Sequence, residues 1–332
     1  MKLNQLFELS LTLNATEFQR IFDNCCNKSF CLEELDNDEY ADRSLAAKGI
    51  TVIFRDSQYK KKVRLLVIPC VVLDDPSDID KLIRKLDKHI VEYFDRRYTL
   101  DDFTLSCLTL TGDIDVGSHT NVYNYLKVIR RVGRVKGFSP ISYDCFDDKA
   151  SFCLSGNSND IDFLLYDLEK FVADQIRSAD AGQKKLQTAG EQTKGILRAE
   201  VRLTKQKAIR EYTDTTDTPA QIVEMMKNSK EIFVEIFARI VPFGDFYKMD
   251  AAVEIIRSEV KDRVMRRKML RLLTLIPEKK SLHLAQKAMN CRDVEKVMDA
   301  FAKLCLSPVT ISKRHEVKQL ECLYEYILGT KQ

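Results

Sequence analysis

The sequence is poor in the residues that build zinc-binding, disulfide-rich and membrane-spanning proteins. It has no tryptophan, only four histidines, and ten cysteines without a CxxC pair, so the usual spacings of a tetrahedral zinc site are missing. The longest apolar run, Leu65 to Leu73, is broken by Pro69 and is far shorter than the ~18 residues that a membrane helix needs. The N-terminus alternates polar and apolar residues and lacks the apolar core of a signal peptide. We expect a soluble cytoplasmic protein whose cysteines stay reduced.

Residues that break secondary structure are few, and the charges nearly cancel. The 332 residues include 11 glycines and 7 prolines, which excludes collagen-like and low-complexity chains. Apolar residues make up 45% of the chain, enough for a full core, and the length suits two domains rather than one. The 53 basic and 50 acidic residues give a net charge of +3. This excludes a polycation that holds nucleic acid by bulk charge, so such binding must come from local patches.

The hydrophobic periodicity changes near residue 212. Before it, short alternating or β-branched runs predict strands with helical stripes between them, and after the segment TDTTDTP the strand pattern ends. We predict an α+β domain over residues 1–212, with helices covering one face of a mostly antiparallel sheet, and an all-α domain over residues 213–332. The predicted strands are Leu6–Leu13, Ile50–Arg55, Val63–Leu73, Phe103–Val116, Ala150–Leu154, Ile161–Tyr166 and Ile196–Leu203. The predicted helices are Ser77–Arg97, Thr120–Val132, Ala220–Val241, Lys248–Val260, Arg263–Ile276, Lys280–Met289, Val294–Leu304 and Leu320–Leu328.

The small net charge hides clusters of one sign. Residues 1–212 carry 32 basic and 33 acidic residues, and residues 213–332 carry 21 and 17. Residues 257–287 alone hold ten basic and three acidic residues. Basic clusters suit phosphate contacts, because neutralising phosphates releases condensed counterions, although such side chains can also merely solvate a helix face. The nucleic-acid-binding candidates are Lys127, Arg130, Arg131, Arg134 and Lys136 in one cluster, and Arg263, Arg266, Arg267, Lys268 and Arg271 in another.

Two aspartates that are two residues apart lie at the end of a predicted apolar strand. In the run LTLTGDID, Asp113 and Asp115 project to the same face of the strand. Neighbouring like charges are costly unless a cation lies between them, and Mg²⁺ or Mn²⁺ accepts oxygen ligands of this kind. We predict a divalent metal site here; the alternative is a solvated strand end whose DIDVGS turn caps the next helix.

Two further strands carry groups suited to phosphate chemistry. ILRAEVRL alternates Arg198, Glu200 and Arg202 on one face with apolar residues on the other, which makes Glu200 a candidate third metal ligand and the arginines candidate phosphate ligands. IDFLLYD ends in Tyr166, and a tyrosine can attack phosphorus to form a covalent phosphotyrosine. The alternatives are a solvent-facing Arg–Glu–Arg ladder and a packed strand tyrosine.

A predicted helix offers rival tyrosines. Tyr123 and Tyr125 lie within Thr120–Val132, with Lys127 one turn after Tyr123. A tyrosine followed by a lysine on a helix that faces an acidic metal site suits a DNA-nicking enzyme. In the alternative interpretation, Tyr125 packs with the apolar residues of this helix.

The order of these segments resembles the rolling-circle replication initiators of phages and plasmids, most closely the gene-two/gene-X type of Gram-positive phages and mobile elements. The resemblance covers roughly residues 105–212. It is carried by DIDVGS (113–118), YLKVI from Tyr125, VKGFSP from Val135, SF with GNS between Ser151 and Ser158, YDLEK from Tyr166 and ILRAEVRL from Ile196, with a weaker echo in LSPVTIS from Leu306.

The resemblance implies an initiator that binds its origin DNA, cuts one strand with a tyrosine and a divalent metal, and stays attached to the 5′ phosphate. Tyr166 matches the tyrosine of the family's Tyr-Asp-Lys segment, and Glu200 matches the glutamate of its Arg-x-Glu strand. The chain departs from the family where Leu168 replaces a lysine, and where Cys107 and Thr109 replace the residues of an Arg-x-Asp pattern. The His-hydrophobic-His pair of many nicking enzymes is missing too, and Asp113-Ile-Asp115 has its spacing.

We therefore predict an origin-binding replication initiator with Tyr166 or Tyr125 as nucleophile, Asp113, Asp115 and Glu200 as ligands of Mg²⁺ or Mn²⁺, and a helicase or replisome partner. One alternative is a DNA-binding regulator that keeps this fold without nicking. Another is a helical protein-interaction module whose basic helices are only solvated.

Overall fold

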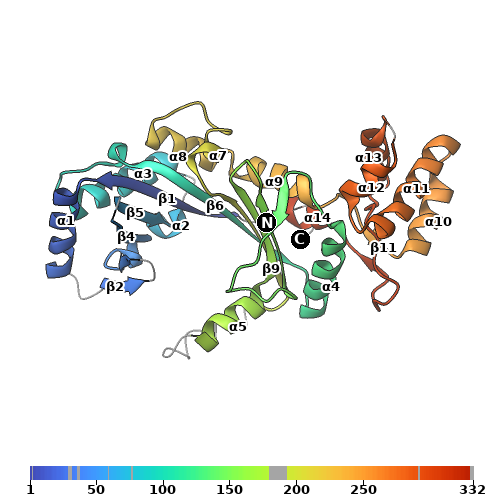
Figure 1. Ribbon diagram of the computed structural model, residues 1–332, viewed down its shortest axis with the longest axis horizontal. Helices are drawn as coiled ribbons and strands as arrows, with labels where there is room; N and C mark the ends of the chain where they lie inside the picture. Colours follow the sequence, from blue (N-terminus) through green and yellow to red (C-terminus); the bar gives the residue numbers. More distant parts are fainter. Residues whose placement is uncertain are drawn as a thin grey trace.

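A ten-stranded antiparallel sheet forms the centre of the protein in the computed structural model, which describes residues 1, 3–28, 32–35, 38–58, 60–75, 78–178, 193–290 and 292–329. The strand order is β2-β3-β4-β5-β1-β6-β10-β9-β8-β7. The neighbouring strands β1 and β6 are the longest of the sheet, and Figure 1 shows them side by side. The strands are β1 (Leu3–Leu13), β2 (Leu32–Leu35), β3 (Glu39–Asp42), β4 (Ile50–Asp56), β5 (Lys61–Val67), β6 (Thr104–Asp115), β7 (Phe138–Pro140), β8 (Ser151–Gly156), β9 (Ile161–Asp167) and β10 (Ile196–Leu203).

The sheet contains the same topology twice. In the first half, β1 is followed by helix α1 (Ala15–Lys28) and four strands, of which the last, β5, returns to pair with β1. In the second half, β6 is followed by helix α4 (His119–Ile129) and four strands, of which the last, β10, returns to pair with β6. The two halves join where β1 and β6 pair antiparallel, from Leu3 opposite Gly112 to Ser10 opposite Thr104. The topology is repeated, but the amino-acid sequences of the two halves show no recognisable repeat.

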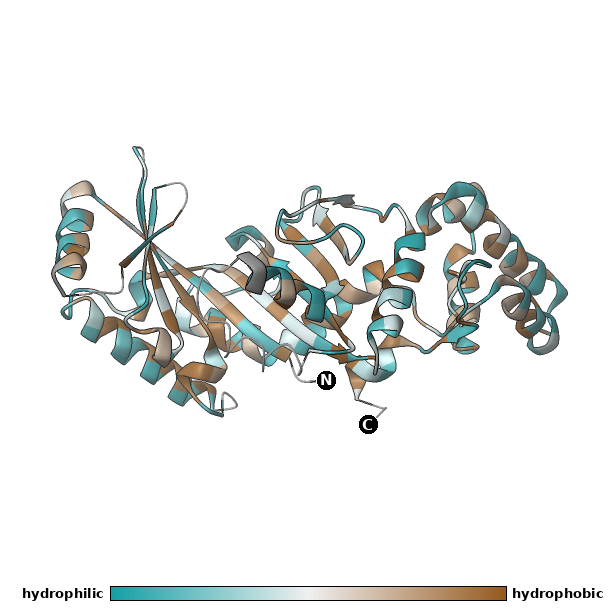
Figure 2. Cartoon of the chain, turned by 90° about the horizontal axis from the view of Figure 1, so that it is seen from below, coloured by the Kyte–Doolittle hydropathy of each residue, from teal (hydrophilic) through white to brown (hydrophobic). Residues whose placement is uncertain are grey.

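The two faces of the sheet differ in polarity because apolar and polar residues alternate along each strand. On β10, Leu197, Ala199, Val201 and Leu203 are fully buried, while Arg198 and Arg202 between them are only half-buried. Figure 2 shows this alternation as brown and teal bands along the strands. The apolar face belongs to the main hydrophobic core, which also takes in residues of α1, α4 and helix α3 (Ile79–Tyr93). The polar face carries the candidate site.

Helices follow the sheet from residue 206 onward. The first of them pack on it, since α8 contacts α3 and β6, and Phe237 of α9 lies 5.8 Å, between ring centroids, from Phe163 of β9. The later ones, α10 to α13, form the end of the molecule opposite α1 (Figure 1). The helices are α7 (Gln206–Ile209), α8 (Thr218–Lys227), α9 (Ser229–Ile240), α10 (Met249–Glu259), α11 (Arg263–Lys279), α12 (Leu282–Ala288), α13 (Val294–Lys303) and α14 (Leu323–Leu328), with a small sheet of β11 (Phe246–Tyr247) and β12 (Gln319–Leu320).

The expected fold class, an antiparallel α+β sheet followed by a helical region, is confirmed. Most predicted strands and helices are present within a few residues of their expected bounds, and the side chains of Asp78 and Ser281 cap α3 and α12. The boundary near residue 212 stays a prediction, because the main hydrophobic core runs across it. No helix among the described residues is long and apolar enough to cross a membrane.

Two predicted elements differ from the structure for local reasons. The strand Val63–Leu73 ends at Val67, because Pro69 lacks a donor for the strand ladder and starts the short helix α2 (Pro69–Val72). The helix Ala220–Val241 is two helices separated at Asn228, which ends α8 and starts α9. Helices α1, α5 (Leu168–Ser178) and α7 and strands β2, β3 and β7 were not predicted, nor were the short strands β11 and β12 in the region expected to be all-α.

The second half of the sheet is held against the helical end at a close backbone contact. Gly133, which follows the 3₁₀ turn η3 (Arg130–Val132), has φ +67°, and an added Cβ would collide with the Lys280 carbonyl oxygen and lie 2.8 Å from the Ser281 Cα. We expect Gly133→Ala to lower the free energy of unfolding by at least about 1 kcal/mol more than Gly137→Ala. Gly137 is the matched control, since it also has a positive φ, +81°, but no atom within 4 Å of the added Cβ. Urea denaturation measures both, and equal losses would contradict this close packing.

Candidate functional site

Three central strands bring the predicted polar residues to one face of the sheet. Strand β10 lies between β6 and β9, so Arg198 stands opposite Asp113 on one side and opposite Tyr166 on the other. Glu200 and Arg202 follow on the same face at steps of two. The register therefore gathers residues from three separate segments of the sequence into one cluster.

Arg198 and Asp113 form a bidentate ion pair. The guanidinium Nε donates to Oδ1 of Asp113 at 2.6 Å, and Nη2 donates to Oδ2 at 2.8 Å. Both oxygens of the carboxylate are thus engaged by one cation, and both side chains are partly buried. Bidentate pairs of this kind are the strong class of charged hydrogen bond, so Asp113 is neutralised within the sheet.

Tyr166 and Glu200 form the most buried polar contact of the cluster. The phenol donates to Oε1 of Glu200 at 2.5 Å, while Oε2 of Glu200 accepts from Nε and Nη2 of Arg202 at 3.0 and 2.6 Å. Burial raises the pKa of Tyr166 well above its ordinary value, the charge of Glu200 raises it further, and Arg198 acts in the opposite direction. The phenol is therefore protonated at neutral pH, with a carboxylate as its acceptor.

Aromatic rings cover this tyrosine. Phe146 lies 4.5 Å and Phe171, on α5, lies 5.2 Å from the Tyr166 ring, measured between centroids. Together with Leu164 and Leu168 they form a second, smaller core on the polar face of the sheet. Only 2% of Tyr166 is exposed, so its oxygen cannot contact a large substrate in this arrangement.

The two helix tyrosines lie in opposite environments. Tyr125 is buried, and its phenol donates to the Glu321 carbonyl oxygen at 3.0 Å while its ring packs against Phe246. It thereby joins α4 to the C-terminal segment, as expected of a packing residue. Tyr123 is 42% exposed, with the Lys127 ammonium 3.8 Å from its ring centroid.

The predicted metal ligands are not gathered into one set. Asp113 and Asp115 line the same pocket of about 520 Å³, but Glu200 does not line it. Asp113 is bound to Arg198, Glu200 to Tyr166 and Arg202, and Asp115 accepts from the Gly117 amide at 2.8 Å. Three occupied carboxylates of this kind do not fit a metal ion as they stand, and metal binding here stays a prediction.

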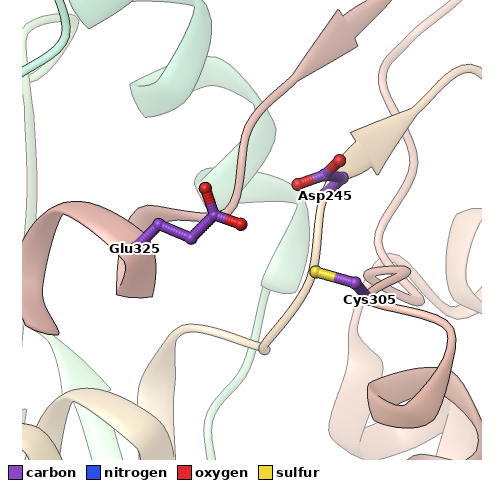
Figure 3. Close-up of side chains that lie close together, drawn as sticks. All are labelled: Asp245, Cys305 and Glu325. Carbon is purple, nitrogen blue, oxygen red and sulfur yellow. The ribbon is translucent and has the colours of Figure 1, made fainter. Parts of the chain in front are cut away.

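Another group in the described part of the chain does bring three metal-ligating side chains together. The ligand atoms of Asp245, Cys305 and Glu325 all lie within 4.8 Å of one another, and Figure 3 shows the three side chains pointing toward a common space. Asp245 is already engaged, because it accepts from the Cys322 amide at 2.8 Å and from Gln319 at 3.0 Å. We interpret this group as a structural junction that joins β11, β12 and α14.

The arginines of the sheet and those of α11 differ in whether they form ion pairs with carboxylates. On the sheet, Arg64, Arg198 and Arg202 each contact a carboxylate. On α11, the stripe formed by Arg263, Arg267 and Arg271 is exposed at a spacing of four residues, which places the three on one helix face. Among the residues that the structure describes, neither these three nor Arg266 forms an ion pair, whereas Lys268 pairs with Asp293 at 3.0 Å. The arginines of α11, unlike those of the sheet, therefore keep their positive charge available to a ligand.

The other predicted basic cluster is divided between structural and exposed positions. Arg130 donates to the Ser151 carbonyl oxygen at 3.1 Å, and burial lowers the pKa of both Arg130 and Arg131. Arg130 thereby joins η3 to the first residue of β8, and Arg131 is half-buried. Arg134 and Lys136 lie beyond η3 and are exposed, so they stay available for a ligand.

Some polar residues of this region were not among the candidates. His119, the first residue of α4, places Nδ1 3.0 Å from Oδ2 of the buried Asp167, and the Tyr143 phenol donates to Asp162 at 3.0 Å. In the sequence, Asp167 directly follows the candidate Tyr166 and could have been found as its neighbour. Nothing in the sequence indicates that residue 119 lies beside residue 167, because their contact depends on how α4 packs on the sheet.

The Tyr166–Glu200 hydrogen bond makes a measurable prediction about stability. A charge-assisted bond in a buried site should couple the two side chains by about 1 kcal/mol or more in a double-mutant cycle of Tyr166→Phe and Glu200→Gln. Urea denaturation of the wild type, both single variants and the double variant gives the coupling. The cycle of Tyr125→Phe with Glu200→Gln is the control and should be additive to within ~0.5 kcal/mol. Additivity in both cycles would mean that the bond contributes nothing.

Comparisons with known proteins give a structural likeness but no match to a family model or a curated protein. Among solved structures, the chain is similar to the rolling circle replication initiator protein from Geobacillus stearothermophilus, with a TM-score of 0.35 and 10% sequence identity, over 95% of this chain and 100% of that one. This is a distant likeness, to a protein of the family that the sequence resembles.

Proposed function

We propose that the protein is a replication initiator of the rolling-circle type, which binds origin DNA and nicks one strand through Tyr166. One observation carries this proposal. The sequence resemblance singles out two residues that are 34 positions apart, Tyr166 and Glu200, and the fold joins them by a hydrogen bond of 2.5 Å. A hydroxyl paired with a carboxylate is the arrangement of a nucleophile and its general base.

The reaction follows from these two groups and their neighbours. The Tyr166 oxygen attacks the phosphorus of a phosphodiester and passes its proton to Glu200 as the new P–O bond forms. The bond from phosphorus to the 3′ oxygen breaks, and that oxygen takes a proton from water. The product is a 5′ phosphate linked to Tyr166 and a free 3′ hydroxyl. Arg198 and Arg202 flank the phenol, and guanidinium groups suit the negative charge that develops on phosphate.

This reaction requires that DNA can reach the phenol of Tyr166. Phe146 and Phe171 cover Tyr166, so DNA can reach it only after these rings have moved. The same burial, together with the pairing of Asp113 by Arg198, favours a second candidate function. In that case the protein is a DNA-binding regulator that retains the initiator fold without nicking.

DNA binding is proposed for either case, with α11 as the main contact. The Arg263, Arg267 and Arg271 stripe presents three guanidinium groups that have no acidic partner in the described part of the chain, and arginine binds phosphate bidentately. A helicase or other replisome protein is the partner that the initiator function calls for. A protein-interaction module without DNA affinity is the remaining possibility, and it requires that the α11 arginines are only solvated.

Covalent capture tests the nicking proposal. The wild-type protein, incubated with single-stranded origin DNA and Mn²⁺, Mg²⁺ or a chelator, should form a protein–DNA adduct that is stable to boiling in detergent. Tyr166→Phe should abolish the adduct, because the nucleophilic oxygen is removed, and Tyr125→Phe should retain it. Dependence of the adduct on a divalent ion would support the predicted metal. Binding of DNA without any adduct from the wild type would favour the regulator.

Salt-dependent affinity tests the contact through α11. Arg267→Ala with Arg271→Ala should weaken DNA binding and reduce the slope of log affinity against log salt by about two, because each arginine would neutralise one phosphate. Fluorescence anisotropy between ~50 and ~200 mM salt measures the slope. The matched control is Lys81→Ala with Lys85→Ala, which removes two exposed charges at the same helical spacing from α3. An equal weakening in both variants would contradict a specific role of α11.

A further inference from the structure

A surface groove lies where the second half of the sheet meets the C-terminal helices. It has a volume of about 620 Å³, and its ionisable lining residues are Lys136, from the segment after η3, and His283, Lys287, Arg292 and Glu295, from α12, α13 and their connection. A smaller adjoining hollow of about 170 Å³ shares Lys136 and His283 and adds Arg134 and Arg239. Residues that are more than 140 positions apart thus share one concave surface.

The charge of this groove is strongly positive. Lys136, Lys287 and Arg292 are exposed, and among the described residues none of them forms an ion pair or a side-chain hydrogen bond. Glu295 is the one acidic residue of the lining, against three permanent cations and a histidine. Unlike the arginines of the sheet, these cations keep their charge free for a ligand from outside the chain.

Two contacts hold the two walls of the groove in a fixed position relative to each other. The Ser281 hydroxyl donates to the Arg134 carbonyl oxygen at 2.9 Å and also accepts from the Leu284 amide, which caps α12. Beside it, the backbone of Gly133 lies too close to Lys280 for any side chain at position 133. Like charges brought together on a rigid surface repel one another, and an anionic ligand relieves this repulsion.

We propose that this junction groove is a second DNA-backbone site, in which Lys136, Lys287 and Arg292 bind consecutive phosphates of the duplex. The lining favours phosphodiester over an apolar small molecule, because it consists almost entirely of polar side chains, including the amides Gln286 and Asn290 as neutral donors. The inference rests on the proposed function, since origin DNA is the ligand. It extends the contact from α11 to α12, which packs beside it, and to the sheet-bearing half of the chain.

His283 makes binding in this groove sensitive to pH. Burial lowers its pKa below the ordinary value of 6.5, and the neighbouring Lys287, Lys136 and Arg134 lower it further, while Glu295 is the acidic residue of the same lining. The imidazole of the free protein is therefore neutral at pH 7. A bound phosphate stabilises the imidazolium and raises this pKa, so DNA binding takes up a proton. Affinity rises as the pH falls from the pKa of the complex toward that of the free protein.

The experiment compares three proteins of full length by anisotropy with a labelled duplex. Lys136→Ala/Lys287→Ala/Arg292→Ala should lower affinity at least about tenfold at ~100 mM salt and reduce the salt slope by two to about three. The matched control, Lys81→Ala/Arg84→Ala/Lys85→Ala, removes three exposed charges from α3 and should leave the slope near that of the wild type. All the changed side chains are exposed, and equal urea midpoints verify that folding is intact.

The outcomes separate this inference from the proposed function. If the wild type binds DNA and the groove variant keeps its salt slope, or is weakened no more than the α3 control, the groove is not a phosphate site. If the wild type does not bind DNA at low salt, the proposed function fails and this inference fails with it. His283→Gln should reduce the dependence of log affinity on pH by up to about one per pH unit between pH 6 and 7.5. An unchanged dependence would remove the role of His283.

Discussion

The antiparallel pairing of β1 with β6 is the interaction on which the rest of the structure depends. It joins two five-stranded units of the same topology into one sheet, and each unit places its last strand beside its first. In the second unit this return puts β10 between β6 and β9. Arg198 therefore meets Asp113 and Tyr166 at once, and Glu200 reaches Tyr166. The candidate catalytic pair exists only because this order of strands is kept.

Charge is distributed differently on the sheet and on the helical end. On the polar face of the sheet, Arg64, Arg198 and Arg202 each lie against a carboxylate, and the partner of Arg202 is the glutamate that accepts from Tyr166. On α11 and in the junction groove, the exposed arginines and lysines named above have no acidic partner among the described residues. An unpaired cation is free to exchange water and counterions for phosphate, whereas a paired one must first break its ion pair. This contrast supports the proposed division of the chain into a site for chemistry and a surface for DNA.

Much of the fold could be predicted from local pattern, and much of the site could not. The alternation of ILRAEVRL determines which face each residue of β10 occupies, so the common face of Arg198, Glu200 and Arg202 was predictable. Their partners were not, because the registers of β6 and β9 against β10 come from long-range pairing. Asp113 has the pattern of a metal ligand, and nothing in that pattern indicates that it pairs with Arg198. No pattern in the sequence indicated His283 or Arg292, because the groove that they line forms only where α12 and η3 meet.

The central claim is that Tyr166 is a nucleophile toward DNA, and peptide mapping tests it most directly. Tryptic digestion releases residues 150–170 as a peptide whose only tyrosine is Tyr166. After reaction with single-stranded origin DNA and nuclease trimming, mass spectrometry should find this peptide carrying a 5′-linked nucleotide. Attachment at any other tyrosine, or DNA binding without a modified peptide, would contradict the account.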